Sequence, residues 1–162
     1  MSDDDVERLE IERKFLISNA PIPGQQPSPI HQGYITVGSD GTEVRLRRKG
    51  GRYFQTIKQG SGLSRRETEV ELTQWQFETL WPQTEGRRVV KDRYEIPYRG
   101  RMIELDVFHG RLEGLIVAEV EFDSVRDSES FIAPNWFGED VTDDPRYRNR
   151  SLALDGRPGE TP

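Results

Sequence analysis

The sequence predicts an antiparallel β-rich domain with two helices, an α+β fold whose strands close into a barrel around a charged interior. Two observations lead to this fold class. Charged residues alternate with apolar residues in most of the expected strands, and the alternating charges are of both signs. Alternate residues of a strand share a face, so each strand has one ionic and one apolar face. A barrel provides an inner face on which these charges would converge.

The charged series begins at residues 10–14, where Glu10, Glu12 and Lys14 share one face. Later strands repeat the pattern. In chain order they contribute Glu43, Arg45 and Arg47; Thr56 and Lys58; Glu67, Glu69 and Glu71; Lys91 and Arg93; Glu104 and Asp106; and Glu119 and Glu121. Carboxylates alone would indicate a cation site, and cations alone a polyanion site. The mixture suits a polyanion that arrives with a divalent metal ion.

Turn and breaker residues divide the chain into the expected elements. Strands are expected over 8–18, 31–37, 42–48, 52–59, 65–72, 87–97, 98–109 and 112–123. The segment 19–29 carries four prolines and should be a loop, because proline has no N–H and fixes its own φ. Thr73 and Gln76 form a capping box that opens a helix, which Pro82 ends. A second helix is expected over 126–133, and 141–154 has no clear pattern.

The length of 162 residues fits one domain. We expect an acidic, disordered lead-in over 1–7, a single domain over 8–155 and a flexible tail over 156–162. The chain has no cysteine, so a metal would need oxygen ligands or the two histidines. His31 and His109 lack the spacing of a ligand pair. The sequence therefore indicates Mg²⁺ or Mn²⁺ held by carboxylates.

Charge and hydropathy limit the partners. No apolar run approaches membrane-spanning length and no signal segment is apparent, so we expect a cytoplasmic protein. The net charge is −6 and the basic residues are dispersed, which argues against a nucleic-acid groove. A small polyanion in a locally basic pocket is still allowed as a partner, with no nucleic acid and no membrane. A homodimer is compatible with the sequence.

The charged motifs, taken in their order along the chain, resemble those of the triphosphate tunnel metalloenzymes, or CYTH superfamily. The resemblance covers about 9–154 and rests on Glu-x-Glu-x-Lys at 10–14, Arg45-x-Arg47, Lys58, the Glu67/Glu69 strand, Lys91-x-Arg93, Glu104-x-Asp106 and Glu119-Val120-Glu121-Phe122. Residues 136–139 and 147–149 look most like the short bacterial branch, several members of which resemble inorganic tripolyphosphatases. The resemblance implies an eight-stranded antiparallel tunnel that hydrolyses or rearranges triphosphates with Mg²⁺ or Mn²⁺.

We assign roles by charge. The substrate-binding residues expected are Lys14, Arg45, Arg47, Lys58, Lys91 and Arg93, with Glu67 and Glu69 beside them. The metal ligands expected are Glu10, Glu12, Glu119 and Glu121, with Asp106 and Glu104 as further candidates. The catalytic set expected is Lys91, Arg93, Glu10 and Glu12. Water could be activated by a second ion or a carboxylate, or by Lys91 with a lowered pKa, and the sequence leaves both open.

Three functions fit these features. A metal-dependent triphosphatase that converts inorganic tripolyphosphate to pyrophosphate and phosphate is favoured, because no extended aromatic segment for base recognition accompanies the charges. A class IV-like adenylate cyclase, or a thiamine or nucleoside triphosphatase, is an alternative. A non-catalytic polyphosphate-binding module is a third, which the carboxylates disfavour. The simpler interpretations are solvated side chains at Glu67 and Glu69 and ion pairs at Glu43 and Glu71.

Overall fold

The computed structural model describes residues 11–59 and 66–159. The elements in chain order are β1 (Ile11–Leu16), β2 (Ser28–Val37), β3 (Glu43–Lys49), β4 (Arg52–Gln59), β5 (Arg66–Leu72), α1 (Gln74–Leu80), η1 (Trp81–Thr84), β6 (Arg88–Tyr98), β7 (Arg101–His109), η2 (Gly110–Leu112), β8 (Ile116–Phe122), α2 (Val125–Glu129), η3 (Pro145–Tyr147) and α3 (Asn149–Asp155). The expected lead-in over 1–7, Glu10 and the end of the expected tail lie outside the described residues.

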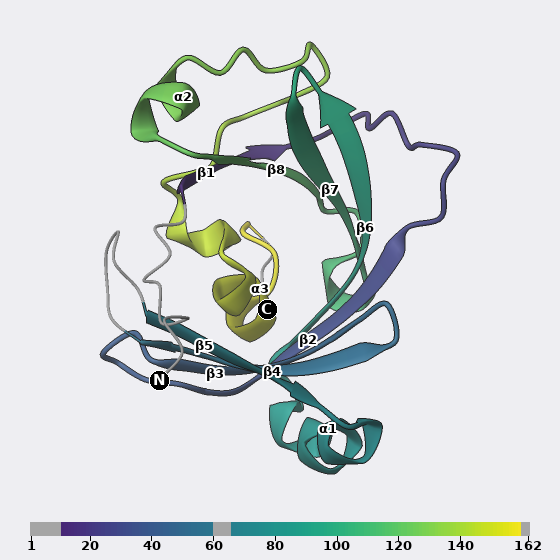
Figure 1. The fold of residues 1–162 in the computed structure, drawn as a ribbon, viewed down its shortest axis with the longest axis vertical. Helices are drawn as coiled ribbons and strands as arrows, with labels where there is room; N and C mark the ends of the chain where they lie inside the picture. Colours follow the sequence, from purple (N-terminus) through teal and green to yellow (C-terminus); the bar gives the residue numbers. More distant parts are fainter. Residues whose placement is uncertain (1–10, 60–65, 160–162) are drawn as a thin grey trace, which may run out of the picture.

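The eight strands form one antiparallel sheet in the order β1-β8-β7-β6-β2-β3-β4-β5. The sheet curls around α3, while α1 and α2 lie on its outer side (Figure 1). We call the side that faces α3 concave and the other side convex. Among the described residues β1 and β5 end the strand order, so the closed barrel expected from the sequence is not confirmed.

A short segment after α2 takes the edge of β1 that a closing strand would need. The backbone N–H of Gly138 donates to Leu16 at 2.8 Å, Leu16 donates to Glu139 at 2.9 Å, and Val141 donates to Lys14 at 2.8 Å. We call residues 138–142 the strap. Because the strap uses the backbone groups of β1, it stands where β5 would have to pair to close the barrel.

Three sequence expectations need correction. β2 begins at Ser28, so Pro29 lies in a strand and not in the expected loop. At that end β2 pairs with β6 but not with β3. A proline is tolerated there because one side of the strand has no partner to bond. α2 spans only Val125–Glu129, with Ser124 as its N-cap. The patternless stretch 141–154 contains η3 and most of α3. No helix in the described ranges is long and apolar enough to cross a membrane.

The convex face carries an apolar core, as the alternation of the strands predicts. Phe15, Ile103, Leu105 and Phe122 are buried there, and Phe131, Trp136 and Phe137 from the stretch after α2 pack over them. Burying such a cluster on one face fixes the register of β1, β8 and β7, because a slip of one residue would turn these side chains to the other face. The charged residues between them must then point to the concave side.

The concave side is apolar at one end. Tyr34, Val89, Phe108 and Val117 form a cluster with Leu152 and Ala153 of α3. The C-terminal helix is therefore held by its own apolar residues against this end of the sheet, and the charged residues of the same strands lie beyond it. Apolar packing therefore closes one end of the concave side, which we call the recess.

Gly138 tests the strap. A Cβ added at Gly138 would lie 2.5 Å from the backbone oxygen of Leu16, which cannot move aside as a side chain can. We expect Gly138→Ala to lower the free energy of unfolding by about 1–3 kcal/mol in urea denaturation. Gly24→Ala is the matched control, since a Cβ there meets nothing within 4 Å. Equal stability of the two variants would contradict the strap contact.

Candidate active site

The concave face collects the predicted site residues that the structure describes. Strand alternation and register place on it Glu12 and Lys14 (β1), Arg45 and Arg47 (β3), Thr56 and Lys58 (β4), Glu67 and Glu69 (β5), Lys91 and Arg93 (β6), Glu104 and Asp106 (β7), and Glu119 and Glu121 (β8). Directly opposed pairs include Lys14 with Glu119, Glu119 with Glu104, and Arg93 with Asp106. The prediction that these strands share one charged face is confirmed.

Asp106 is the buried centre of this face. Arg93 binds it with two parallel hydrogen bonds, Nε to Oδ1 at 2.7 Å and Nη2 to Oδ2 at 2.8 Å, and Lys91 Nζ lies 2.8 Å from Oδ2. Burial by itself would raise the pKa of Asp106, but the Lys91 and Arg93 charges outweigh it and lower the pKa to about 2. Both carboxylate oxygens are engaged by protein cations, so in this structure Asp106 anchors Lys91 and Arg93.

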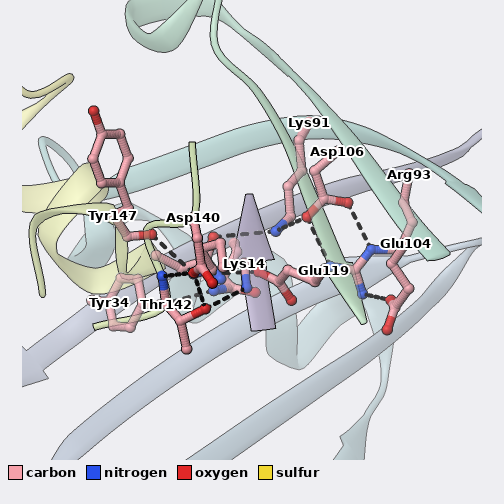
Figure 2. A network of polar contacts seen from close by, with 12 residues as sticks. Lys14, Tyr34, Lys91, Arg93, Glu104, Asp106, Glu119, Asp140, Thr142 and Tyr147 are labelled. Atoms are coloured by element: carbon pink, nitrogen blue, oxygen red, sulfur yellow. Dashed lines mark hydrogen bonds and ion pairs between the residues drawn. The ribbon is translucent and has the colours of Figure 1, made fainter. Parts of the chain in front are cut away.

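Two further ion pairs extend the network along the sheet (Figure 2). Arg93 also contacts Glu104 through Nη1, and Lys14 Nζ lies 3.3 Å from Glu119 Oε1. Burial raises the pKa of Glu104 and the Glu119 carboxylate raises it further, against the lowering effect of Arg93. The carboxylates of β7 and β8 are thus close enough to repel one another, which is the condition under which a cation is attracted.

Arg45 and Arg47 on β3 form the basic side of the recess. The Nε atoms of both are buried and have no hydrogen-bond partner among the described residues. Burial lowers the pKa of Arg47, and the charges of Arg45 and Arg93 lower it further. Buried guanidinium donors that repel one another are costly unless an acceptor completes them. Their arrangement fits a multiply charged oxyanion.

The three carboxylates of β5 have different surroundings. Glu69 accepts a hydrogen bond from Thr56 Oγ1 at 2.8 Å, and Thr56 also accepts from Arg45 at 3.5 Å, so Glu69 supports the basic side. Glu71 forms the ion pair with Arg52 that the simpler interpretation predicted, at 2.7 Å. Glu67 is exposed and stands opposite Lys58. Glu43 is paired too, but with Arg150 of α3 at 3.2 Å.

Carboxylates that suit a metal ion stand on β1, β7 and β8. Glu12 is directly opposed to Glu121, and Glu104 to Glu119. Within residues 11–59 and 66–159 no group of three or more candidate ligands is gathered closely enough to hold an ion by itself. Mg²⁺ usually binds one or two protein carboxylates and completes its shell with water and substrate phosphates. The donor chemistry of Glu12 and Glu121 suits such an ion.

Sequence reasoning did not assign Tyr147 or Asn149 to the site. The Tyr147 carbonyl accepts a hydrogen bond from Lys14 Nζ at 3.0 Å, and Asn149 Oδ1 accepts one from Lys91 Nζ at 3.2 Å. No strand alternation marks these residues, because they lie in η3 and at the start of α3. Tyr34 is buried, and its hydroxyl accepts a hydrogen bond from Gln32 at 2.8 Å.

The Asp106 cluster generates a stability prediction. Asp106→Asn would leave Lys91 and Arg93 buried without their common anion, so we expect the free energy of unfolding in urea to fall by about 3–5 kcal/mol. Asp92→Asn is the matched control on the same strand pair, because Asp92 is partly exposed and pairs only with His109 in the described structure. We expect about 1 kcal/mol or less there. Similar losses in both variants would refute the anchoring role.

Known proteins share this sequence and fold. No family model matches the chain. An inorganic triphosphatase of Nitrosomonas europaea is 51% identical over 147 residues, covering 90% of this chain and 97% of the relative. An inorganic triphosphatase of Acetivibrio thermocellus is 36% identical, over 88% and 92% of the two chains. A crystal structure of an inorganic triphosphatase superposes with a TM-score of 0.74 at 48% identity, covering 90% of this chain and 94% of the other.

A more distant structure shares the fold alone. A putative adenylate cyclase from Bacillus halodurans has a TM-score of 0.56 at 18% identity, and the match covers 94% of each chain. The curated relatives carry the stronger conclusion, since their similarity extends over nearly the whole of both sequences. The chain therefore belongs to the CYTH superfamily of triphosphate tunnel metalloenzymes, as a relative of its inorganic triphosphatases.

Proposed function

We propose that the protein hydrolyses inorganic tripolyphosphate to pyrophosphate and phosphate in a metal-dependent reaction. The observation that carries the proposal is the pair of buried, unpartnered Nε donors of Arg45 and Arg47, which face the same recess as the Asp106 cluster. Donors of this kind call for an oxyanion with several acceptor oxygens. The relatives named as inorganic triphosphatases support the same activity.

Binding and orientation are the main work of such a site. Phosphoryl transfer needs its phosphates held in line and their charge neutralised, and little covalent help from the protein. Arg45 and Arg47 would hold phosphate oxygens on one side of the recess, and Lys14, Lys91 and Arg93 on the other, with Lys58 at its margin. Arg93 is well suited to a fixed position, because Asp106 holds its guanidinium by two hydrogen bonds.

Glu12 and Glu121 would hold a Mg²⁺ or Mn²⁺ ion, with Glu119 and Glu104 as neighbouring carboxylates. When bound, such an ion supplies charge neutralisation and polarises a phosphoryl oxygen. Lys14 holds Glu119 and Arg93 holds Glu104. Glu12 and Glu121 are directly opposed on β1 and β8, beyond these two pairs as seen from Asp106.

Two groups remain candidates for activating water. Lys91 is buried, and burial lowers its pKa while Arg93 lowers it further, although Asp106 acts in the opposite direction. A lowered pKa brings a lysine closer to acting as a base. Glu12 is the alternative, as a carboxylate beside the proposed ion. The two acceptors of Lys91, Asp106 and Asn149, favour its ammonium form, which suits contact with a phosphate oxygen better than proton abstraction.

The closed end of the recess favours a substrate without a base. Tyr34, Phe108 and Leu152 fill this end together, so the side chains of the protein already occupy the apolar space that a purine or thiazole ring would seek. A phosphate chain needs only the charged part of the concave face. This selects inorganic tripolyphosphate ahead of ATP and thiamine triphosphate.

A substrate panel tests the proposed function. Phosphate and cyclic nucleotide release are measured with tripolyphosphate, pyrophosphate, ATP and thiamine triphosphate, each with Mg²⁺, with Mn²⁺ or with EDTA. We expect phosphate from tripolyphosphate with either metal and none with EDTA, with kcat/KM for ATP and thiamine triphosphate lower by about 100-fold or more. Cyclic AMP from ATP without phosphate from tripolyphosphate would identify a cyclase instead. Tight binding of tripolyphosphate without turnover would identify a binding module.

Arg47 tests the binding side of the recess. Arg47→Ala removes a buried charged donor, so we expect KM for tripolyphosphate to rise by about 10–100-fold, corresponding to about 1.5–3 kcal/mol for a hydrogen bond to a charged group. Arg48→Ala is the matched control, because the next residue of β3 points to the convex side and is exposed. A KM for Arg47→Ala equal to that of Arg48→Ala would remove Arg47 from the substrate site.

A further inference from the structure

Lys91 is held from two directions by parts of the chain that lie far apart in sequence. One contact comes from the neighbouring strand, where Asp106 Oδ2 lies 2.8 Å from the ammonium nitrogen. The other comes from the first residue of α3, where Asn149 Oδ1 accepts a hydrogen bond at 3.2 Å. A lysine donor can meet only the carbonyl oxygen of the Asn149 amide, so the contact also fixes the orientation of that side chain.

The buried Lys91 ammonium has two acceptors among the described residues. An ammonium group has three protons, and the described residues supply acceptors for two of them. The Phe108 ring lies 5.3 Å from the nitrogen and offers a cation–π contact rather than a hydrogen bond. With Asp106 alone, the ammonium could rotate about a single ion pair. With Asn149 as well, the third proton has a fixed direction.

Asn149 owes its position to contacts on both sides of it in the chain. Before it, the Tyr147 carbonyl binds Lys14 at 3.0 Å; after it, Arg150 binds Glu43 at 3.2 Å. Leu152 and Ala153 anchor the same helix in the apolar cluster of the concave side. Removal of the Asn149 amide would therefore leave α3 attached by its other contacts, and the role of the amide can be separated from that of the helix.

We propose that Asn149 is a positioning residue for Lys91, whose amide oxygen directs the remaining Lys91 proton toward a phosphate oxygen of the substrate. This inference rests on the proposed function, since it takes Lys91 to contact tripolyphosphate. The amide is an acceptor without charge, so it orients the ammonium without neutralising it. A carboxylate in its place would orient the ammonium equally well and would repel the polyanion.

Two variants at one position separate orientation from charge. Asn149→Ala removes the acceptor, and we expect kcat for tripolyphosphate to fall by about 10–100-fold with little change in KM, since small misplacements of a catalytic group cost this much. Asn149→Asp keeps the acceptor and adds a charge, so we expect kcat near that of the wild type and KM raised about tenfold. Asn135→Ala is the matched control, because Asn135 is an exposed residue of the stretch that covers the convex side, and it should leave both constants unchanged.

Calorimetry on the same variants shows whether the Asn149 amide has only a structural role. We expect Asn149→Ala to melt within about 3 °C of the wild type, because α3 keeps its other anchors. A wild-type kcat in Asn149→Ala would overturn the inference. Equal loss of kcat in the Ala and Asp variants, in step with a lowered melting temperature, would overturn it too. The proposed function fails separately, if the wild-type protein releases no phosphate from tripolyphosphate.

Discussion

The interaction between Asp106 and its two cations is the constraint on which the concave face depends. Burying one carboxylate with Lys91 and Arg93 is tolerable only because all three side chains find charged partners at hydrogen-bond distance. Asp106, Lys91 and Arg93 together carry one excess positive charge. The Glu104 carboxylate balances it through its ion pair with Arg93. Removing one of the three side chains would leave the desolvation cost of the other buried charges uncompensated. The positions of β6 and β7 and the chemistry of the recess are therefore set by the same contacts.

Apolar packing decides where these charges can lie. The convex face is closed by Phe131 and Phe137 over Phe15, and one end of the concave side is closed by Leu152 with Tyr34 and Phe108. The charged residues lie on the remaining part of the concave face, and the strap occupies the edge of β1 by backbone hydrogen bonds. A polyanion entering there meets cations whose hydration has largely been removed, so each contact is stronger than on an open surface.

Strand alternation made much of this predictable. Glu104, Asp106 and Glu119 were assigned to one face because apolar residues separate charged ones, and the register confirms that face. Closure of the barrel was not predictable from alternation, since the pattern within a strand says nothing about which edge pairs with which. The strap at Gly138 and the amide of Asn149 were beyond reach for a related reason. Both belong to irregular or short segments, whose positions are set by tertiary contacts rather than by a period.

The distribution of charge across the recess also explains why a divalent cation would be needed. The basic residues Arg45 and Arg47 lie on β3, whereas Glu12 and Glu121 lie at the β1–β8 side. In the proposed function the arginines would hold a phosphate chain, and its negative charges would be repelled by these carboxylates. A divalent ion held by Glu12 and Glu121 would supply the positive charge that offsets this repulsion. Glu12 and Glu121 would weaken the binding of a metal-free triphosphate. The same carboxylates would favour a triphosphate that carries a divalent ion.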